Sequence, residues 1–270
     1  MISKNKDKTG IMEFLNKDIF DYKDYQKVLI NKDKILLFDY DGTLAPFVKD
    51  REKAFMYEGF ADLINKLAKK YKIYFITGRT VDSLKKLLYC LDFPPCIWGS
   101  HGNEVLKSNG DYLNLNPQNK VLLQKIWDYL ELDKIVEHTE KKVSSIALHY
   151  REIPQNIREN IERLKKQILN KFNNIKILEF DGGYEFIIPS FNKGYAVSQI
   201  IKENKNCFPV YFGDDITDED AFLEVKGSGI SFLIKDTFRN TYADIWINSH
   251  QEFYRVLKNE FLEEKCLKED

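Results

Sequence analysis

The stretch ILLFDYDGTLAP, which runs from Ile35 to Pro46, carries a continuous apolar run directly into two aspartates, Asp39 and Asp41. One interpretation is a tight turn, because Asp-Gly is a strong hairpin signal. The other is a binding site at the carboxyl end of a buried strand, where open α/β sheets hold their ligands. This segment alone does not choose between the two, so the surrounding sequence has to decide.

The flanking sequence repeats an alternation of short apolar runs and amphipathic segments. It predicts strands in the runs KIYFITGR (72–79), CIWGSHG (96–102), PVYFGDD (209–215), GISFLIK (229–235) and ADIWIN (243–248), and helices at 60–70, 81–91, 194–202 and from His250 onward. Strands and helices that alternate with short connections are typical of a parallel sheet with crossover helices. Uniformly apolar strands indicate that both faces of this sheet are covered.

The pattern changes after residue 107. The segments there predict a hairpin at Asn109-Gly110, helices at 121–130 and 154–171, and strands at 144–151, 175–180 and 184–189. We therefore expect an α/β protein with a Rossmann-like core at 31–107 and 190–270, and an inserted α+β domain at 108–189. Apolar residues between 11 and 29 lie near a helical period, which predicts an N-terminal helical segment within residues 1–30.

Composition excludes several classes of partner. The 41 basic residues nearly cancel the 42 acidic ones and leave a formal charge of -1, which argues against nucleic acid or an anionic membrane as the partner. No apolar run reaches the roughly 18 residues that a membrane span requires. The cysteines (Cys90, Cys96, Cys207 and Cys266) form no C-x-x-C pair, which favours free thiols and a cytoplasmic protein.

Several polar segments should meet at one edge of the predicted sheet, because parallel strands share the edge at which they end. These segments are Asp39–Asp41, Thr77–Arg79, GDDITDED (213–220) and the helix start at Lys193. Two carboxylates about 4 Å apart repel by roughly 4 kcal/mol at an effective dielectric near 20, so this cluster needs a cation. Ligands that are all hard oxygens favour Mg²⁺ over zinc. A metal, a lysine and a threonine at strand ends together indicate a phosphate site.

These motifs resemble those of the haloacid dehalogenase superfamily of phosphotransferases. DYDGTL is similar to its first motif, and Thr77, Lys193 and GDDITDED are similar to the second, third and fourth. The resemblance implies that Asp39 is the nucleophile and that Asp41 is the general acid and then the base. It also implies that Thr77 and Lys193 bind phosphoryl oxygens. Mg²⁺ would be held by Asp39, the backbone carbonyl of Asp41, and Asp214.

A narrower resemblance, to the trehalose-6-phosphate phosphatase family, rests on further segments. They are FDYDGTLAP (38–46), FITGR (75–79), GSHGNEV (99–105), EKKVSSIALHYR (140–151) and YEFIIPSFNKG (184–194). The resemblance implies that the inserted domain is a cap, and that a small-molecule sugar phosphate, trehalose 6-phosphate, is the substrate. It implies substrate contacts from Gly78, Arg79, Ser100, His101, Gly102, Glu140, Lys142 and Glu185.

Some points remain open at this stage. Arg79 can bind phosphate or pair with the aspartates, and Asp215 and Asp218 have no assigned role. Ile188 precedes Pro189 where the family often has arginine, so another sugar phosphate (of sucrose, mannosylglycerate or a hexose) is an alternative substrate. A non-catalytic sugar-phosphate sensor is a second alternative. His250 is interpreted as a surface residue.

Overall fold

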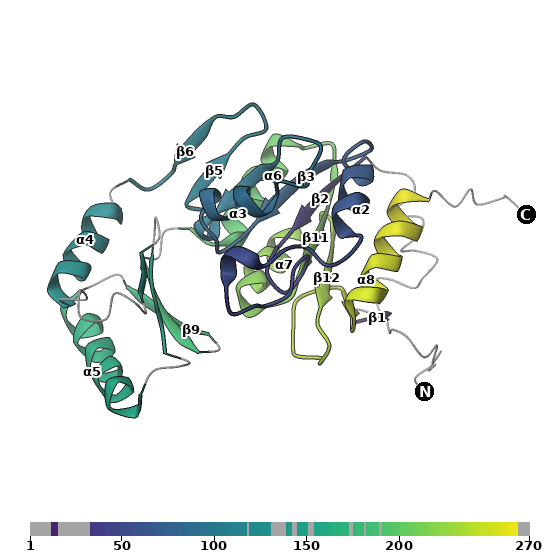
Figure 1. Ribbon diagram of the computed structural model, residues 1–270. Helices are drawn as coiled ribbons and strands as arrows, with labels where there is room; N and C mark the ends of the chain where they lie inside the picture. The colour runs from purple at the N-terminus through teal and green to yellow at the C-terminus, as the bar shows by residue number, and fades with distance from the viewer. Residues whose placement is uncertain are drawn as a thin grey trace, which may run out of the picture.

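The computed structural model describes residues 12–15, 33–117, 119–130, 139–141, 145–150, 154–172, 175–180, 182–188 and 191–263. Its larger part is a nine-stranded sheet in the order β1-β13-β12-β11-β2-β3-β4-β5-β6 (Figure 1). The strands are β1 (Met12–Phe14), β2 (Lys34–Phe38), β3 (Lys72–Ile76), β4 (Cys96–Gly99), β5 (Glu104–Leu106), β6 (Tyr112–Asn114), β11 (Phe208–Gly213), β12 (Ile230–Ile234) and β13 (Ile245–Ile247).

The strands from β13 to β4 run parallel, and β1, β5 and β6 are antiparallel to their neighbours. The core helices are α2 (Phe60–Leu67), α3 (Val81–Leu87), α6 (Lys193–Glu203), α7 (Glu219–Val225) and α8 (His250–Val256). Shorter helical turns are η1 (Arg51–Lys53), η2 (Ser100–Gly102), η5 (Ile216–Asp218) and η6 (Leu257–Leu262). The predicted parallel sheet with crossover helices is confirmed.

Strand β2 lies in the middle of the sheet because both of its faces are apolar. Leu36 and Phe38 join a cluster that includes side chains of α2, α3 and α8. Ile35 and Leu37 join a separate cluster with side chains of α6 and α7. Alternation along one strand therefore supplies two cores. The parallel pairing of β2 with β3 and with β11 places the carboxyl end of β2 between the ends of those two strands.

The inserted segment forms a second, four-stranded antiparallel sheet in the order β7-β8-β10-β9. Its elements are α4 (Asn119–Leu130), β7 (Thr139–Lys141), β8 (Ser145–His149), α5 (Gln155–Lys171), β9 (Lys176–Phe180) and β10 (Gly183–Ile187). Ile146, Leu148 and Phe186 pack against apolar side chains of α4 and α5. Both helices lie on the side of this sheet away from the core, so the other face is turned toward the core (Figure 1). The predicted α+β insertion is confirmed in type.

Two boundaries differ from expectation. Met12–Phe14 form the strand β1 against β13, although the apolar spacing predicted a helix there; residues 16–32 of the predicted helix lie outside the described residues. The hairpin β5–β6 extends the core sheet to Asn114, beyond the boundary expected after residue 107. At residues 12–14, pairing with a neighbouring strand outweighs the local periodicity, whereas the hairpin predicted at Asn109-Gly110 forms but belongs to the core sheet. Among the described residues, no helix is both long and apolar enough to cross a membrane.

Stability of the core should depend strongly on Phe212, which is 0% exposed and stacks between Phe38 (ring centroids 4.9 Å apart) and Phe232 (4.8 Å). Phe212→Ala is expected to lower the free energy of unfolding by about 3–5 kcal/mol, because it leaves a cavity in a packed layer. Denaturant unfolding measures this loss. Phe238→Ala, at a residue 46% exposed, is the matched control. A similar loss in both variants would contradict this account of the core.

Candidate active site

The carboxyl ends of β2 and β11 bring two buried aspartates together. Asp39 follows β2 and Asp214 follows β11, and they are 4% and 3% exposed. The Asp39 amide donates to the Phe212 carbonyl at 2.9 Å, which ties the two strand ends together. The hydroxyl of Thr43 lies between the carboxylates, 3.4 Å from Asp39 Oδ2 and 3.3 Å from Asp214 Oδ1. The expected convergence of these aspartates is therefore present.

Lys193 supplies the positive charge of this cluster. It opens α6, where Asn192 caps the helix by accepting from the Tyr195 amide. Its side chain is 3% exposed, and the ammonium group donates to Asp39 Oδ1 and to Asp218 Oδ1, each at 2.7 Å. A buried charge is tolerated when it is paired and hydrogen-bonded in this way.

Asp218, to which the sequence assigned no role, is the third carboxylate of the cluster. It is fully buried, and its oxygens accept from the hydroxyl of Tyr211 at 2.5 Å and from the amides of Asp214 and Asp215 at 3.1 and 3.0 Å. With these partners and Lys193 in place, Asp218 fixes the acidic loop and the lysine. The i, i+3 spacing of Asp215 and Asp218, which form a capping box, is the sequence signal for this role.

The cluster fits a hard divalent cation. One oxygen from each of Asp39, Asp214 and Asp218 lies within 4.8 Å of the others. Gly42 has a φ of +86°, and a Cβ atom there would lie 2.2 Å from Asp214 Oδ2. Glycine therefore leaves the space that this carboxylate occupies. All three groups are carboxylate oxygens, the ligands that Mg²⁺ prefers.

Burial changes the proton affinities of these groups. It raises the pKa of Asp39 from its usual 3.8 to about 7, although the charge of Lys193 opposes this change. Burial and the charge of Asp39 also raise the pKa of Asp214 well above its usual value. Burial alone would lower the pKa of Lys193, but the charges of Asp218 and Asp39 outweigh it and raise that pKa. When all three carboxylates are ionised, they carry more negative charge than one lysine neutralises, so a bound cation would favour the ionised forms that burial opposes.

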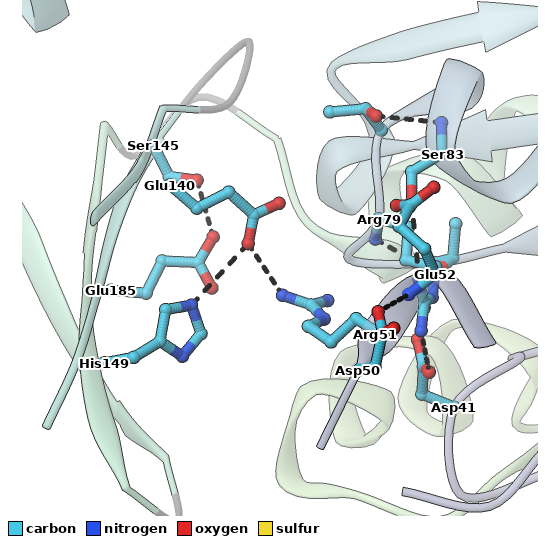
Figure 2. A network of polar contacts seen from close by, with 12 residues as sticks. Asp41, Asp50, Arg51, Glu52, Arg79, Ser83, Glu140, Ser145, His149 and Glu185 are labelled. Carbon is cyan, nitrogen blue, oxygen red and sulfur yellow. Dashed lines mark hydrogen bonds and ion pairs between the residues drawn. The ribbon is translucent and has the colours of Figure 1, made fainter. Parts of the chain in front are cut away.

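Asp41 faces a different partner from Asp39. Its carboxylate accepts hydrogen bonds from Arg79 Nε and Nη2, both at 2.6 Å, in a bidentate ion pair (Figure 2). Arg79 also donates to the hydroxyl of Ser83 at 3.3 Å. The arginine is buried, so it orients Asp41 and does not lie open to a ligand. Of the two roles left open for Arg79, the structure shows the pairing.

The end of β3 is held in place by the loop that follows β4. The Thr77 amide donates to the Trp98 carbonyl and the His101 amide donates to the Thr77 carbonyl, both at 2.9 Å. A Cβ atom at Gly78 would lie 2.7 Å from the His101 ring, so glycine is required for this close approach. The His101 backbone has a φ of +56°, which is uncommon for a residue with a side chain. Thr77, Gly78 and His101 are thus in contact, as their strand ends predict.

Ser100 and Gly102 have structural partners. Ser100 is fully buried and its hydroxyl donates to Glu104 at 2.6 Å, so it does not line the expected sugar entrance. A Cβ atom at Gly102 would lie 2.8 Å from the Asn192 carbonyl, so this glycine allows the loop to pack against the start of α6. The sequence placed both residues at the correct edge, but it could not show which way each one faces.

The cap contributes two glutamates on its core-facing side. Glu140 of β7 and Glu185 of β10 are both cross-strand partners of Ala147 in the central strand β8. The two glutamates therefore lie in one row across the sheet. The hydroxyl of Ser145 donates to Glu185 at 2.5 Å, and Glu185 lies 3.9 Å from His101 of the core. Lys142, the third expected cap residue, lies outside the described residues.

The interpretation of His250 as a surface residue is wrong. Its Nε2 atom is hydrogen-bonded to the Gly42 carbonyl at 2.8 Å, and its ring lies 4.1 Å from that of Tyr57. Burial lowers its pKa. His250 thus supports the turn after Asp41 from more than 200 positions away, and nothing in the local sequence signals this contact.

Two curated plant proteins are similar to this chain in sequence. The chain is 25% identical to trehalose-phosphate phosphatase B of Arabidopsis thaliana, over 95% of this chain and 74% of the relative. It is 26% identical to the probable trehalose-phosphate phosphatase C of the same plant, over 90% of this chain and 81% of the relative.

Two solved structures match the fold. One is a trehalose-6-phosphate phosphatase related protein (TM-score 0.66, 23% identity, 84% of this chain and 97% of that one). The other is the C-terminal domain of the C. albicans trehalose-6-phosphate phosphatase (TM-score 0.69, 20% identity, 87% and 96%). At this identity the likeness shows the fold, which is that of haloacid dehalogenase phosphatases with a cap. The trehalose-phosphatase family model matches residues 37–244. Because that match spans well over half of the sequence, the chain belongs to the trehalose-phosphatase family, whose members are phosphatases that act on phosphoric monoesters.

Proposed function

We propose that this phosphatase hydrolyses trehalose 6-phosphate to trehalose and phosphate through an aspartyl-phosphate on Asp39. The observation that carries the proposal is the buried contact of Asp39 with Lys193 at 2.7 Å, beside Asp214, in a member of the trehalose-phosphatase family. This arrangement presents a carboxylate nucleophile next to a fixed positive charge.

The reaction proceeds in two steps on this chain's own residues. The Asp39 carboxylate attacks phosphorus, and the bond from phosphorus to the sugar oxygen breaks as Asp41 protonates that oxygen. Asp41 then takes a proton from water, whose oxygen attacks phosphorus and releases Asp39 and phosphate. Lys193 and Thr77 hold the phosphoryl oxygens, and Lys193 stabilises their negative charge. Arg79 orients the ionised carboxylate of Asp41 through its two hydrogen bonds.

Magnesium is the proposed cofactor. Asp39 and Asp214 would hold it, with the backbone carbonyl of Asp41, and Asp218 would support them through the Asp214 amide. When bound, the ion supplies positive charge that favours the ionised form of Asp39 and neutralises phosphoryl oxygens. We place the reaction in the cytoplasm, a proposal supported by the free thiols of Cys90, Cys96 and Cys207.

The sugar would bind between the cap face and the end of the core sheet. Glu140 and Glu185 lie on either side of Ala147 in one row across the cap sheet, so both carboxylates would contact a sugar bound against this face. Carboxylates accept hydrogen bonds from sugar hydroxyls, so these two residues suit a polyhydroxylated ligand. Lys142 belongs to the same proposed set.

Phosphate release from a substrate panel tests this proposal. The panel holds trehalose 6-phosphate, sucrose 6-phosphate, glucose 6-phosphate and 4-nitrophenyl phosphate, each with Mg²⁺ and with EDTA. We expect the highest kcat/KM for trehalose 6-phosphate and loss of turnover with EDTA. Glu185→Gln should lower kcat/KM for the sugar phosphate about tenfold or more, because an amide donor replaces one of the two acceptor oxygens and the negative charge is lost, and leave the aryl phosphate nearly unchanged.

Glu179→Gln, on an exposed glutamate of the neighbouring strand β9, is the control for the cap variant. Metal-dependent activity that prefers another sugar phosphate would overturn the substrate and keep the chemistry. No release from any compound would favour the sensor.

The nucleophile assignment predicts the behaviour of Asp39→Asn. Turnover should fall by at least roughly 10³-fold, because the amide cannot form the phosphoenzyme. The melting temperature should not fall, because burial already disfavours the charged form of Asp39 and raises its pKa to about 7. Steady-state assays and thermal unfolding measure the two quantities. Asp33→Asn, on an exposed aspartate just before β2, should keep wild-type activity.

Metal binding should stabilise the protein more at high pH than at low pH. Because the pKa of Asp39 is raised from 3.8 to about 7, its contribution to stability is complete at low pH and is lost as the pH rises through 7. The pKa of Asp214 is raised in the same direction. A cation that binds the ionised carboxylates reverses this loss.

We therefore expect Mg²⁺ to raise the melting temperature more at pH 8 than at pH 5.5. The concentration is about 10 mM, chosen to exceed the dissociation constant. The measurement is differential scanning fluorimetry at constant ionic strength. Asp214→Asn should remove most of the difference. An equal shift at both pH values, or an undiminished shift in that variant, would argue against a metal on these carboxylates.

A further inference from the structure

Glu140 of the cap faces Arg51 of the core (Figure 2), and Glu185, the other cap glutamate, lies near His101 of the core. Glu185 lies 3.9 Å from His101, and Glu140 accepts a hydrogen bond from Arg51 Nη1 at 2.8 Å. His149, on the same cap face, lies 3.7 Å from the same oxygen of Glu140. Arg51 belongs to η1, in the segment that follows the Asp39–Asp41 motif, and it has had no role so far.

The turn that carries Arg51 is fixed to the core. Asp50 caps it by accepting from the Glu52 amide at 3.3 Å, and the Glu52 carboxylate accepts from the hydroxyl of Ser83 at 2.9 Å. That hydroxyl also accepts from Arg79, the partner of Asp41. Just after the turn, the Tyr40 hydroxyl donates to the Ala54 carbonyl at 2.8 Å. Arg51 thus projects from a segment tied on both sides to the residues around the catalytic aspartates.

We propose that Arg51 is a positioning residue for the sugar end of the site. It docks on Glu140 when the cap lies over the core, and so holds this carboxylate at a fixed place relative to Asp39. The inference rests on the proposed function, because the proposed sugar-phosphate substrate supplies the hydroxyl that Glu140 would bind. It deepens that function by naming a core residue that sets how the cap presents its glutamate.

The exposure of the contact suits this role. The side chains of Arg51, Glu140 and His149 are 36%, 38% and 37% exposed, so a ligand can reach them. An ionised carboxylate can accept about four hydrogen bonds, so Glu140 can bind a sugar hydroxyl while it also accepts from Arg51. Ordering Glu140 before the ligand arrives lowers the entropy that binding must remove. A pair this exposed has a modest effect, about two- to fivefold in an equilibrium constant, and salt should weaken it.

Steady-state kinetics of four full-length proteins test the proposal: wild type, Arg51→Ala, Glu140→Gln and the double variant. Each is assayed with the sugar phosphate that the wild type prefers in the panel and with 4-nitrophenyl phosphate. We expect Arg51→Ala to raise KM for the sugar phosphate about two- to fivefold at low salt, with kcat little changed. The aryl phosphate has no group that reaches Glu140, so its KM should stay the same.

Three further readouts separate positioning from a general structural effect. Arg51→Ala should add little to Glu140→Gln, because both remove the same ion pair. Arg51→Lys should restore part of the lost affinity, and 1 M NaCl should shrink the Arg51→Ala effect. Lys53→Ala, which removes a charge from the same turn at an exposed side chain paired only locally with Asp50, is the matched control and should change nothing.

The outcomes distinguish this inference from the proposed function. A wild type that prefers another sugar phosphate overturns the substrate but still tests Arg51 with that compound. An unchanged or lower KM in Arg51→Ala, equal effects on both substrates, or full additivity with Glu140→Gln would overturn the role of Arg51 alone. A wild type that hydrolyses no sugar phosphate would overturn both.

Discussion

The ammonium group of Lys193, buried between Asp39 and Asp218, is the contact on which the active site depends. Carboxylates gathered at about 4 Å repel one another by roughly 4 kcal/mol per pair even at an effective dielectric near 20. Lysine neutralises one charge and gives each of two carboxylates a hydrogen bond. The parallel pairing of β2 with β11 and the start of α6 beside them are therefore requirements of this cluster. The remaining negative charge is what makes the cluster suited to a divalent cation.

The two aspartates of the first motif are separated in chemistry although they are two residues apart. Asp39 is almost fully buried, with Lys193 and Asp214 near it, and burial raises its pKa. Asp41 is partly exposed and held by both nitrogens of Arg79. Asp39 thus depends on positive charge beside it to attack as the ionised carboxylate, while Asp41 stays in reach of water, as an acid and base requires.

The cap sheet serves two purposes through simple alternation along its strands. Ile146 and Leu148 of β8 pack toward the cap helices, while Ser145, Ala147 and His149 face the core. The helix-facing side supplies the stability, so the other side can carry polar groups such as Glu185 without loss of a core. A one-residue slip of register would exchange the two sets of side chains, so the apolar side also fixes the position of the polar one.

Sequence alone determined the features that depend on short-range patterns. Apolar runs that alternate with amphipathic segments predicted the parallel sheet and the insertion, and strand ends predicted which residues meet beside Asp39. Only the tertiary structure decided where distant pairing or side-chain direction matters. Residues 12–14 became a strand because β13 offers an edge there, and His250 reached Gly42 across most of the chain. Likewise, Lys193 meets Asp218 and Arg51 meets Glu140 only through folding. Local propensity is set by neighbours in sequence, whereas these contacts are set by neighbours in space, and the latter carry the larger free energy once the core is packed.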